Sequence, residues 1–416
     1  MKPWADDAVS GRAGCGPLGP PLSEVQRPLR QQVFERVRAA GTASRSAVAK
    51  DLGLSPATVG ALVTDLAQAG LIEEVAAPRE AGRGRPAVAL AVQGGAHRVM
   101  GMKIGDREAT AVLADFSGNL IATAALARPA GPMRLDDLVE VIADLFHRLA
   151  DGCPVSWLGI GMPGFVDSGS GSVLWSSFLL ERGEPLAGAV RDRLGVPVSI
   201  DNDANLVALA ELWFGAGRVL SDFAVVTIEH GVGMGFVMNH RLYRGAQGLG
   251  MELGHTKVEL DGALCRCGQR GCLEAYVADY ALAREAVTAL NWGHKDGAAQ
   301  AVLLESLYDH AKAGNVTARA IFRRAGRYLA VGLSNVINLF DPALIILSGE
   351  RMRYDYLYAA ETLAEMESLA ISTGRPKPPI EVHARGDLLW ARGAAALALT
   401  ELTDTLLSAP RSAAIA

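Results

Sequence analysis

One histidine and three cysteines stand at a spacing that suits metal binding: His255, Cys265, Cys267 and Cys272. Imidazole nitrogen and thiolate sulfur are preferred donors for zinc, and four of them complete a tetrahedral coordination sphere. Gly268 and Gly271 allow the backbone to turn around an ion. Because the protein fills all four positions, we expect one structural zinc ion per chain, with no position open to a reacting water. The alternative is that the cysteines stay reduced and bind no metal.

The bulk composition is typical of a soluble protein from a reducing compartment. The chain has 416 residues, enough for two or three domains, and 50% of them are hydrophobic. Its five cysteines are an odd number, and three belong to the cluster, which disfavours a disulfide framework. No stretch resembles a membrane span or a signal peptide, so we expect a cytoplasmic protein with no membrane contact. The Pro- and Gly-rich residues 1–23 are expected to form a disordered tail.

Residues 24–92 have the pattern of three short helices and two strands. Apolar side chains recur at helical spacing, Ser44 or Ser46 can cap the second helix, and Ser55 can cap the third. Two short segments that follow are expected to pair as the strands of a wing, at 71–75 and 87–92. This order predicts an all-α winged helix-turn-helix, a fold that binds DNA. The alternative is a helical bundle that binds another protein.

The charge of this segment also favours nucleic acid. Nine basic and six acidic residues from Arg27 to Val88 give +3, and since the whole chain carries −5, the remainder carries −8. The expected recognition helix lacks Arg, Lys, Asn and Gln from Ser55 to Asp65, so it lacks the usual bidentate readers of bases.

The wing run Gly82-Arg83-Gly84-Arg85-Pro86 resembles the core of an AT-hook, which suits a narrow A·T minor groove. The alternative is a solvated basic loop. The predicted DNA contacts are Arg45, Ser55, Thr58, Ala61, Arg83 and Arg85. Because paired domains double the contact with DNA, we expect a homodimer or higher homo-oligomer on a palindromic operator with A·T-rich flanks.

Two segments of the C-terminal part repeat one plan. Each predicts three strands joined by turns, over 99–122 and again over 223–243, and helices and buried strands follow each copy. A duplicated α/β lobe is typical of the actin-like sugar kinases, whose lobes are ribonuclease H-like and hold a ligand between them. We expect lobe 1 at 93–201, with 386–410 packing back on it, and lobe 2 with the zinc site at 202–385.

Several motifs resemble those of the ROK family of repressors, open reading frames and kinases. They are Glu252-Leu253-Gly254-His255 with the cysteine cluster, the turn Met162-Pro163-Gly164, and the run from Asp201 to Asn205 with Glu211. With the N-terminal pattern, the chain is similar to the transcriptional repressor branch, such as N-acetylglucosamine and xylose repressors, over about residues 25–400. The resemblance implies that sugar hydroxyls are bound by Asn202, Asp203, Glu252, His255 and Glu274.

The chemistry of these side chains agrees, because carboxylates accept paired hydrogen bonds from hydroxyls and Asn both donates and accepts. The alternative is that all five are structural residues around the zinc. The chain departs from the family pattern at two positions that bear on which sugar is bound. The family often has an Asn and, a little later, a Trp, where this chain has Ser177-Phe178 and Glu181.

The resemblance also implies two phosphate-binding loops in the kinases of the family, and both are altered here. Lys103-Ile104-Gly105-Asp106-Arg107 replaces an Asp-x-Gly-Gly-Thr loop, and Glu229-His230-Gly231 replaces Gly-Thr-Gly. Asp203 stands at the position of the kinase base, now vestigial, without the loops that hold ATP. We therefore expect no enzyme activity.

These observations predict a sugar-responsive DNA-binding regulator, a repressor of carbohydrate uptake or catabolism genes. The alternatives are a ROK-type sugar kinase with an appended DNA-binding domain and a DNA-binding protein whose sugar site is vestigial. A free sugar is the expected effector, because three carboxylates at the site disfavour a phosphate. A phosphosugar held by Lys103, Arg107 and His230 remains an alternative, as does a co-repressor in place of an inducer.

Overall fold

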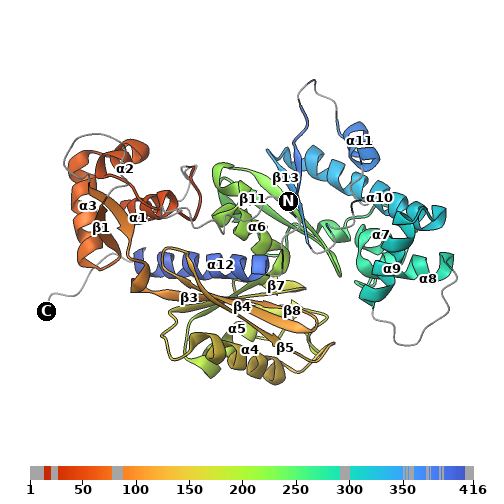
Figure 1. Ribbon diagram of the computed structural model, residues 1–416, viewed down its shortest axis with the longest axis horizontal. Coiled ribbons are helices and arrows are strands. Elements are labelled where there is room, and N and C mark those ends of the chain that lie inside the picture. The colour runs from red at the N-terminus through yellow and green to blue at the C-terminus, as the bar shows by residue number, and fades with distance from the viewer. Residues whose placement is uncertain are drawn as a thin grey trace.

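The computed structural model describes residues 14–19, 27–76, 88–290, 300–349, 352, 355, 360–371, 374, 376–383, 386 and 388–407. Figure 1 shows three regions: a small N-terminal unit at the left, a first α/β lobe at the bottom and a second α/β lobe at the upper right. Among the described residues, none of the helices combines the length and apolar character that a membrane span requires.

The N-terminal unit consists of three helices and a two-stranded antiparallel sheet: α1 (Leu29–Ala40), α2 (Arg45–Leu52), α3 (Pro56–Gln68), β1 (Ile72–Ala76) and β2 (Val88–Val92). Ser44 Oγ accepts from Ala47 N at 3.1 Å, and Ser55 Oγ accepts from Thr58 N at 3.1 Å, so each serine caps its helix. The predicted three helices and paired strands are therefore confirmed. The segment between β1 and β2, with Arg83 and Arg85, lies outside the described residues.

Lobe 1 is built on a five-stranded sheet in the order β5-β4-β3-β6-β9. Helices α4 and α5 and the hairpin of β7 and β8 accompany it. The bounds are β3 (Arg98–Ile104), β4 (Glu108–Asp115), β5 (Leu120–Ala127), α4 (Leu135–Ala150), β6 (Trp157–Met162), β7 (Phe165–Asp167), β8 (Ser172–Trp175), α5 (Leu186–Leu194) and β9 (Val198–Asn202), with a short 3-10 helix before the sheet, η1 (Gly94–Ala96).

Lobe 2 has a second five-stranded sheet, in the order β12-β11-β10-β13-β14. Both sheets start from an antiparallel meander of three strands and add two parallel strands to the first of them. The predicted duplication is therefore confirmed. The strands are β10 (Phe223–Ile228), β11 (Val232–Met238), β12 (Arg241–Tyr243), β13 (Ile345–Ser348) and β14 (Ile380–His383).

The helices of lobe 2 lie on the side of its sheet that is away from the N-terminal unit (Figure 1). They are α7 (Glu274–Val277), α8 (Asp279–Ala289), α9 (Gln300–Lys312), α10 (Val316–Phe340) and α11 (Ala360–Leu369). Two 3-10 helices lie elsewhere in this part of the chain: η3 (Leu253–His255), and η2 (Ala216–Val219), whose Arg218 donates to Ala39 O of the N-terminal unit. Leucine, phenylalanine and alanine side chains of α8, α9 and α10 form one core with the sheet.

Two apolar helices lie between the lobes: α6 (Asp203–Phe214) and α12 (Leu388–Leu407). Helix α6 packs on β10 and β11 of lobe 2, whereas α12 packs on β3 and β6 of lobe 1. The two helices also pack on each other, and most of their side chains are buried. In Figure 1, α12 runs from the centre of the molecule to the N-terminal unit.

Residues 14–19 differ from the disordered tail that composition predicts over 1–23. Gly16 N donates to Trp213 O at 2.9 Å, and Leu18 N donates to Arg218 O at 2.8 Å. Cys15 is buried, and its thiol donates to Ser117 O at 3.0 Å. Backbone hydrogen bonds to lobe residues thus hold a segment whose composition is typical of disorder.

Candidate functional site

A cavity of about 570 Å³ opens between the two lobes. Its wall carries side chains from β3 and the β6–β8 region of lobe 1 and from β10, β11 and the zinc-motif segment of lobe 2. All five residues that the sequence predicted as sugar ligands line this one cavity: Asn202, Asp203, Glu252, His255 and Glu274. The volume is in the range of cavities that enclose small molecules.

The first two of these residues stand at the start of α6. Asn202 caps the helix, since its Oδ1 accepts from Ala204 N at 2.9 Å, and its Nδ2 donates to Gly164 O at 2.8 Å. One Nδ2 proton and one Oδ1 lone pair are therefore left to meet a ligand. Burial raises the pKa of Asp203, and the nearby Lys103 ammonium acts in the opposite direction.

The neighbouring Asp201 holds the backbone and side chains at the start of α6 in place. Its carboxylate accepts from Asn202 N and from Asn205 Nδ2, each at 2.8 Å, and from Arg244 Nη2 at 2.7 Å. Asp201 is 1% exposed, so its role is to hold the Asn202–Asp203 pair in place.

The other two carboxylates approach from lobe 2. Burial raises the pKa of Glu252 to about 7, the nearby His255 opposes this shift, and the neighbouring Asp203 and Glu274 add to it. Glu274 Oε2 accepts from Val232 N at 3.3 Å, and its Oε1 accepts from Tyr280 OH at 3.4 Å. Three carboxylates therefore converge on one cavity, which suits hydroxyl groups as hydrogen-bond donors.

The predicted metal ligands also come together. The ligand atoms of His255, Cys265, Cys267 and Cys272 all lie within 4.8 Å of one another. Cys265 Sγ is 3.7 Å from His255 Nδ1, and Cys267 Sγ is 3.7 Å from Cys272 Sγ. Zinc–sulfur bonds of about 2.3 Å in a tetrahedron separate two sulfurs by about 3.8 Å. The four side chains therefore fit a zinc ion in both donor chemistry and spacing.

The backbone around this cluster needs glycine at one position in particular. Gly271 has φ +76°, and a Cβ atom there would lie 1.6 Å from the carbonyl oxygen of Glu259. Gly268 also has a positive φ, at +88°, in the turn that brings its N within 3.0 Å of Cys265 O. The cluster abuts the cavity, because Cys265 Sγ lies 3.6 Å from Glu274 Oε1.

Aromatic rings form one side of the cavity. Trp175 and Phe165 have ring centroids 5.6 Å apart, and Phe165 and His255 have centroids 5.9 Å apart. Ser177 and Phe178 line the cavity with them. Glu181, the other position at which the sequence departs from the ROK pattern, is exposed and is not among the lining residues.

Trp390 of α12 reaches the cavity from the C-terminal helix, and the sequence analysis missed it. It is 1% exposed and lies under Lys103, whose Nζ is 3.8 Å from the indole centroid. A tryptophan within an otherwise apolar helix is typical of a core residue, so its type and position carry no sign of a ligand cavity.

The two altered loops face each other across the cavity. Lys103 Nζ lies 3.8 Å from Glu229 Oε2, and both side chains are largely buried. His230 Nδ1 lies 3.2 Å from Asp279 Oδ2. Gly105 N donates to Glu108 O at 2.9 Å, and Arg128 Nη1 donates to Gly105 O at 2.6 Å. Residues of both altered loops therefore line the cavity, and an ion pair joins the loops across it.

Four of the six predicted DNA contacts lie in the described part of the N-terminal unit, and Arg83 and Arg85 lie outside the described residues. Arg45, Ser55 and Ala61 are exposed on α2 and α3, and Thr58 is half-buried. Ser55 Oγ lies 2.8 Å from Thr58 Oγ1, so these hydroxyls bond each other at the start of α3. Arg45 Nη2 lies 2.6 Å from Glu74 Oε1 in an exposed ion pair between α2 and β1.

Comparisons with known proteins agree with this arrangement. The xylose repressor of Caldicellulosiruptor bescii is 28% identical over 329 residues, which cover 76% of this chain and 81% of the relative. The crystal structure of a ROK family transcriptional regulator, a homologue of the E. coli MLC protein, matches with a TM-score of 0.77 and 25% identity. That match covers 91% of this chain and 97% of the other.

A ROK family glucokinase from Streptomyces griseus, solved with glucose and AMPPNP, matches with a TM-score of 0.63 and 30% identity. That match covers 99% of the kinase but only 73% of this chain. The sequence profile of the ROK family matches residues 99–401, which leaves the N-terminal helices outside it. On this match over most of its length, the chain belongs to the ROK family.

Proposed function

We propose that this protein is a sugar-responsive transcriptional repressor of genes for carbohydrate uptake or catabolism. One observation carries the proposal: the hydroxyl-binding side chains are kept in the cleft, while the phosphate loops carry Lys103 and Glu229 instead. A protein that binds a sugar without phosphorylating it can report the presence of that sugar. The N-terminal helices, which lie outside the matched ROK profile, provide the part of the chain that would bind DNA.

The proposed DNA-binding domain is a winged helix-turn-helix over residues 24–92. In it α3 is the recognition helix, and the segment between β1 and β2 is the tip of the wing. The exposed positions Arg45, Ser55 and Ala61 support this assignment, and Thr58 stands beside them. Arg83 and Arg85 are proposed to enter an A·T-rich minor groove, since α3 offers few base-reading side chains.

The proposed effector is a free sugar held by Asn202, Asp203, Glu252, His255 and Glu274. The converging carboxylates support hydroxyl recognition and disfavour a phosphate. Trp175 beside the cavity supports a pyranose, because a sugar presents an apolar face that packs on an aromatic ring. The proposed sense is induction, in which the bound sugar releases the repressor from its operator.

The proposed metal is one zinc ion bound by His255, Cys265, Cys267 and Cys272. The ion would supply structural cross-linking, because four protein ligands leave no position for a substrate. The sharing of His255 between the ion and the cleft would make metal loss and sugar sensing interdependent.

The proposed domain limits are 24–92 for the DNA-binding domain, 93–201 with 386–410 for lobe 1, and 202–385 for lobe 2. A cytoplasmic homodimer on a palindromic operator is proposed with them, because one small domain contacts little DNA. Sedimentation of the purified protein with and without operator checks the dimer, and a monomer in both conditions would contradict it.

A sugar kinase with an appended DNA-binding domain is the second candidate. The similarity to the glucokinase and the presence of Asp203 favour it. The cross-cleft ion pair of Lys103 and Glu229 opposes it, because a carboxylate beside a triphosphate is repulsive.

Two screens of the purified full-length chain test the proposal. Selection from a random duplex pool should enrich a palindrome, and a melting-temperature screen should find an aldose that stabilises the protein. Asp203→Asn should lose the sugar-dependent stabilisation and keep the DNA selection. Failure to enrich any sequence would contradict a specific regulator, and sugar-dependent ADP release from ATP would favour the kinase.

A further inference from the structure

The helices α6 and α12 pack on each other and form one contact between the lobes. Each belongs to a different lobe by its packing, α6 to lobe 2 and α12 to lobe 1. They approach each other so closely that a Cβ atom at Gly393 would lie 1.9 Å from the carbonyl oxygen of Leu206. Any rotation of one lobe against the other must therefore displace α6 relative to α12.

Both helices begin at the sugar cleft. Asp203 is the first residue of α6, and Trp390 near the start of α12 lies against Lys103. At 1.5 Å per residue, α6 is about 18 Å long and α12 about 30 Å long. Each helix therefore extends from the cleft toward the N-terminal unit, as the course of α12 shows in Figure 1.

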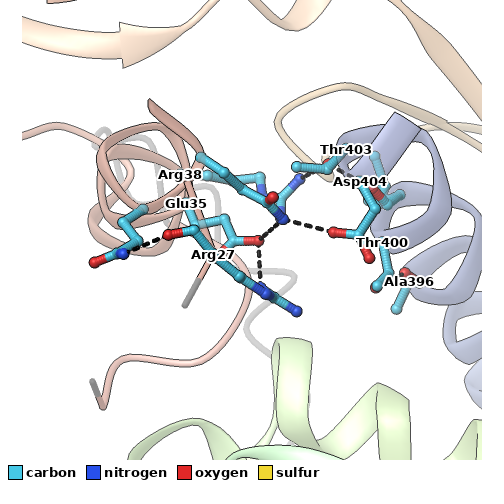
Figure 2. A network of polar contacts seen from close by, with 10 residues as sticks. Arg27, Glu35, Arg38, Ala396, Thr400, Thr403 and Asp404 are labelled. Carbon is cyan, nitrogen blue, oxygen red and sulfur yellow. Dashed lines mark hydrogen bonds and ion pairs between the residues drawn. The ribbon is translucent and has the colours of Figure 1, made fainter. Parts of the chain in front are cut away.

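Arg38 of α1 contacts the far ends of both helices. Its Nη1 donates to Thr403 Oγ1 of α12 at 2.8 Å, and its guanidinium carbon lies 4.5 Å from the ring centroid of Trp213 of α6. Figure 2 shows Arg38 extending to Thr403. The side chain is 4% exposed, and its Nε has no hydrogen-bond partner among the described residues. A buried arginine with an unsatisfied donor is costly to keep in place.

Hydrogen bonds near Arg38 also connect α1 to α12 and to the segment after α6. Gln31 Nε2 donates to Asp404 Oδ1 of α12 at 2.5 Å and to Glu35 Oε1 at 2.9 Å, and Figure 2 shows the chain of contacts from Glu35 to Asp404. Arg218, shortly after α6, donates to Ala39 O at 2.6 Å.

The surroundings leave room for α1 to move. A cavity of about 460 Å³ lies beside Arg38, between α1, α6 and α12, and both apolar and charged side chains line it. Close packing resists displacement, whereas a cavity at an interface permits a second arrangement of the side chains around it.

We propose that Arg38 is the positioning residue that couples closure of the sugar cleft to the placement of the DNA-binding helices. This inference rests on the proposed function and identifies the contacts through which sugar binding would affect the DNA-binding helices. Because Arg38 contacts α6 and α12 together, lobe rotation must either carry α1 with it or break one of the two contacts. Either result changes the position of α2 and α3, which are built on α1.

Two matched substitutions on α12 test this route. Thr403→Val removes the hydroxyl that accepts from Arg38 and keeps the side-chain shape. Thr400→Val is the control, because the Thr400 hydroxyl donates to Ala396 O of its own helix. Arg38→Lys is a second variant, which keeps the charge and loses the planar fork. The probe is whichever of D-xylose and D-glucose stabilises the wild type more.

Two quantities are measured for each variant: the sugar Kd without DNA, and the ratio of operator Kd with sugar to that without it. Allosteric ratios are typically 5- to 150-fold. We expect Thr403→Val and Arg38→Lys to keep the sugar Kd within about twofold and to reduce the wild-type ratio by at least about threefold. Thr400→Val should keep the wild-type ratio.

A wild-type ratio retained in both Thr403→Val and Arg38→Lys would overturn the route through Arg38 while leaving the proposed function intact. A wild-type ratio of one would instead remove the proposed function, and the inference with it. An equal loss in Thr400→Val would also overturn it, since the hydrogen bond of that hydroxyl lies within α12.

Discussion

Lys103 Nζ lies 3.8 Å from Glu229 Oε2, and this pair joins β3 of lobe 1 to the end of β10 in lobe 2. The same ammonium lies 3.8 Å from the Trp390 ring centroid and opposes the rise in the pKa of Asp203. The Lys103 ammonium thus lies near the carboxylates of Asp203 and Glu229 and contacts Trp390 of α12, the helix that extends to the N-terminal unit. The Lys103–Glu229 pair is therefore an ionic contact between the two lobes across the cleft.

Removal of the Lys103 charge is expected to weaken sugar binding. In Lys103→Met, Asp203 and Glu229 would face Glu252 and Glu274 without the Lys103 ammonium, so the affinity should fall about tenfold, or ~1.4 kcal/mol. Glu229→Gln in the Lys103→Met background should recover part of the loss, because one like charge is removed. Calorimetry on the single and double variants measures this coupling, and strictly additive effects would show that the two residues act independently.

The wild-type protein is expected to release no ADP from Mg·ATP with any sugar that it binds. The proposed reason is that Lys103 and Glu229 stand on the two loops that would hold phosphates in a kinase, where phosphoryl transfer depends on positioning and charge neutralisation. A coupled ADP assay measures the rate, and calorimetry with ATP present should give an unchanged sugar Kd. Sugar-dependent turnover that disappears in Asp203→Asn would refute the regulator without catalysis.

Loss of one cysteine ligand is expected to remove zinc and destabilise lobe 2. Cys267→Ser should contain less than one zinc per chain and melt about 10 °C lower, since a structural ion contributes several kcal/mol to folding. Cys153→Ser is the control, because Cys153 is an exposed cysteine outside the cluster. Elemental analysis and thermal melting measure both effects. Full zinc occupancy in Cys267→Ser would show that the ligand set is wrong.

The two wing arginines are expected to determine A·T preference. Arg83→Ala with Arg85→Ala should weaken operator binding about tenfold, which is typical of a lost base-specific contact, and flatten the preference for A·T flanks. Arg191→Ala with Arg193→Ala on α5 is the control for charge alone, since both are exposed far along the chain in lobe 1. Sequence selection with each double variant measures the preference, and an unchanged A·T bias would assign the readout to α3.

Local patterns were enough to predict the zinc cluster, the helix starts and the duplicated lobes. The four predicted metal ligands lie within one short segment, so their spacing alone predicts a tetrahedral site, and the structure places their ligand atoms close together. Ser44 and Ser55 accept hydrogen bonds from backbone amides three residues later, so such caps can be predicted from local sequence. The sequence left Ser44 and Ser46 open for the second helix, and in the structure Ser44 is the cap. The repeated strand–turn pattern gave the two sheets because each meander is formed by consecutive strands.

Contacts between distant residues were not predictable in this way. Trp390 lies against Lys103, and Arg38 bonds to Thr403 across 365 residues, yet each resembles an ordinary core or surface residue in its own helix. Residues 14–19 have the composition of a tail, but hydrogen bonds to Trp213 and Arg218 carbonyls hold them. Only the folded chain brings these partners together.

The most direct test of the account is operator binding measured by fluorescence anisotropy with and without saturating sugar. The DNA is the selected palindrome, and sugar occupancy is verified by calorimetry on the same sample. We predict that the sugar weakens operator binding by wild-type protein at least about fivefold, and that Asp203→Asn binds operator equally well in both conditions. Unchanged operator affinity of wild-type protein with the sugar demonstrably bound would contradict the account.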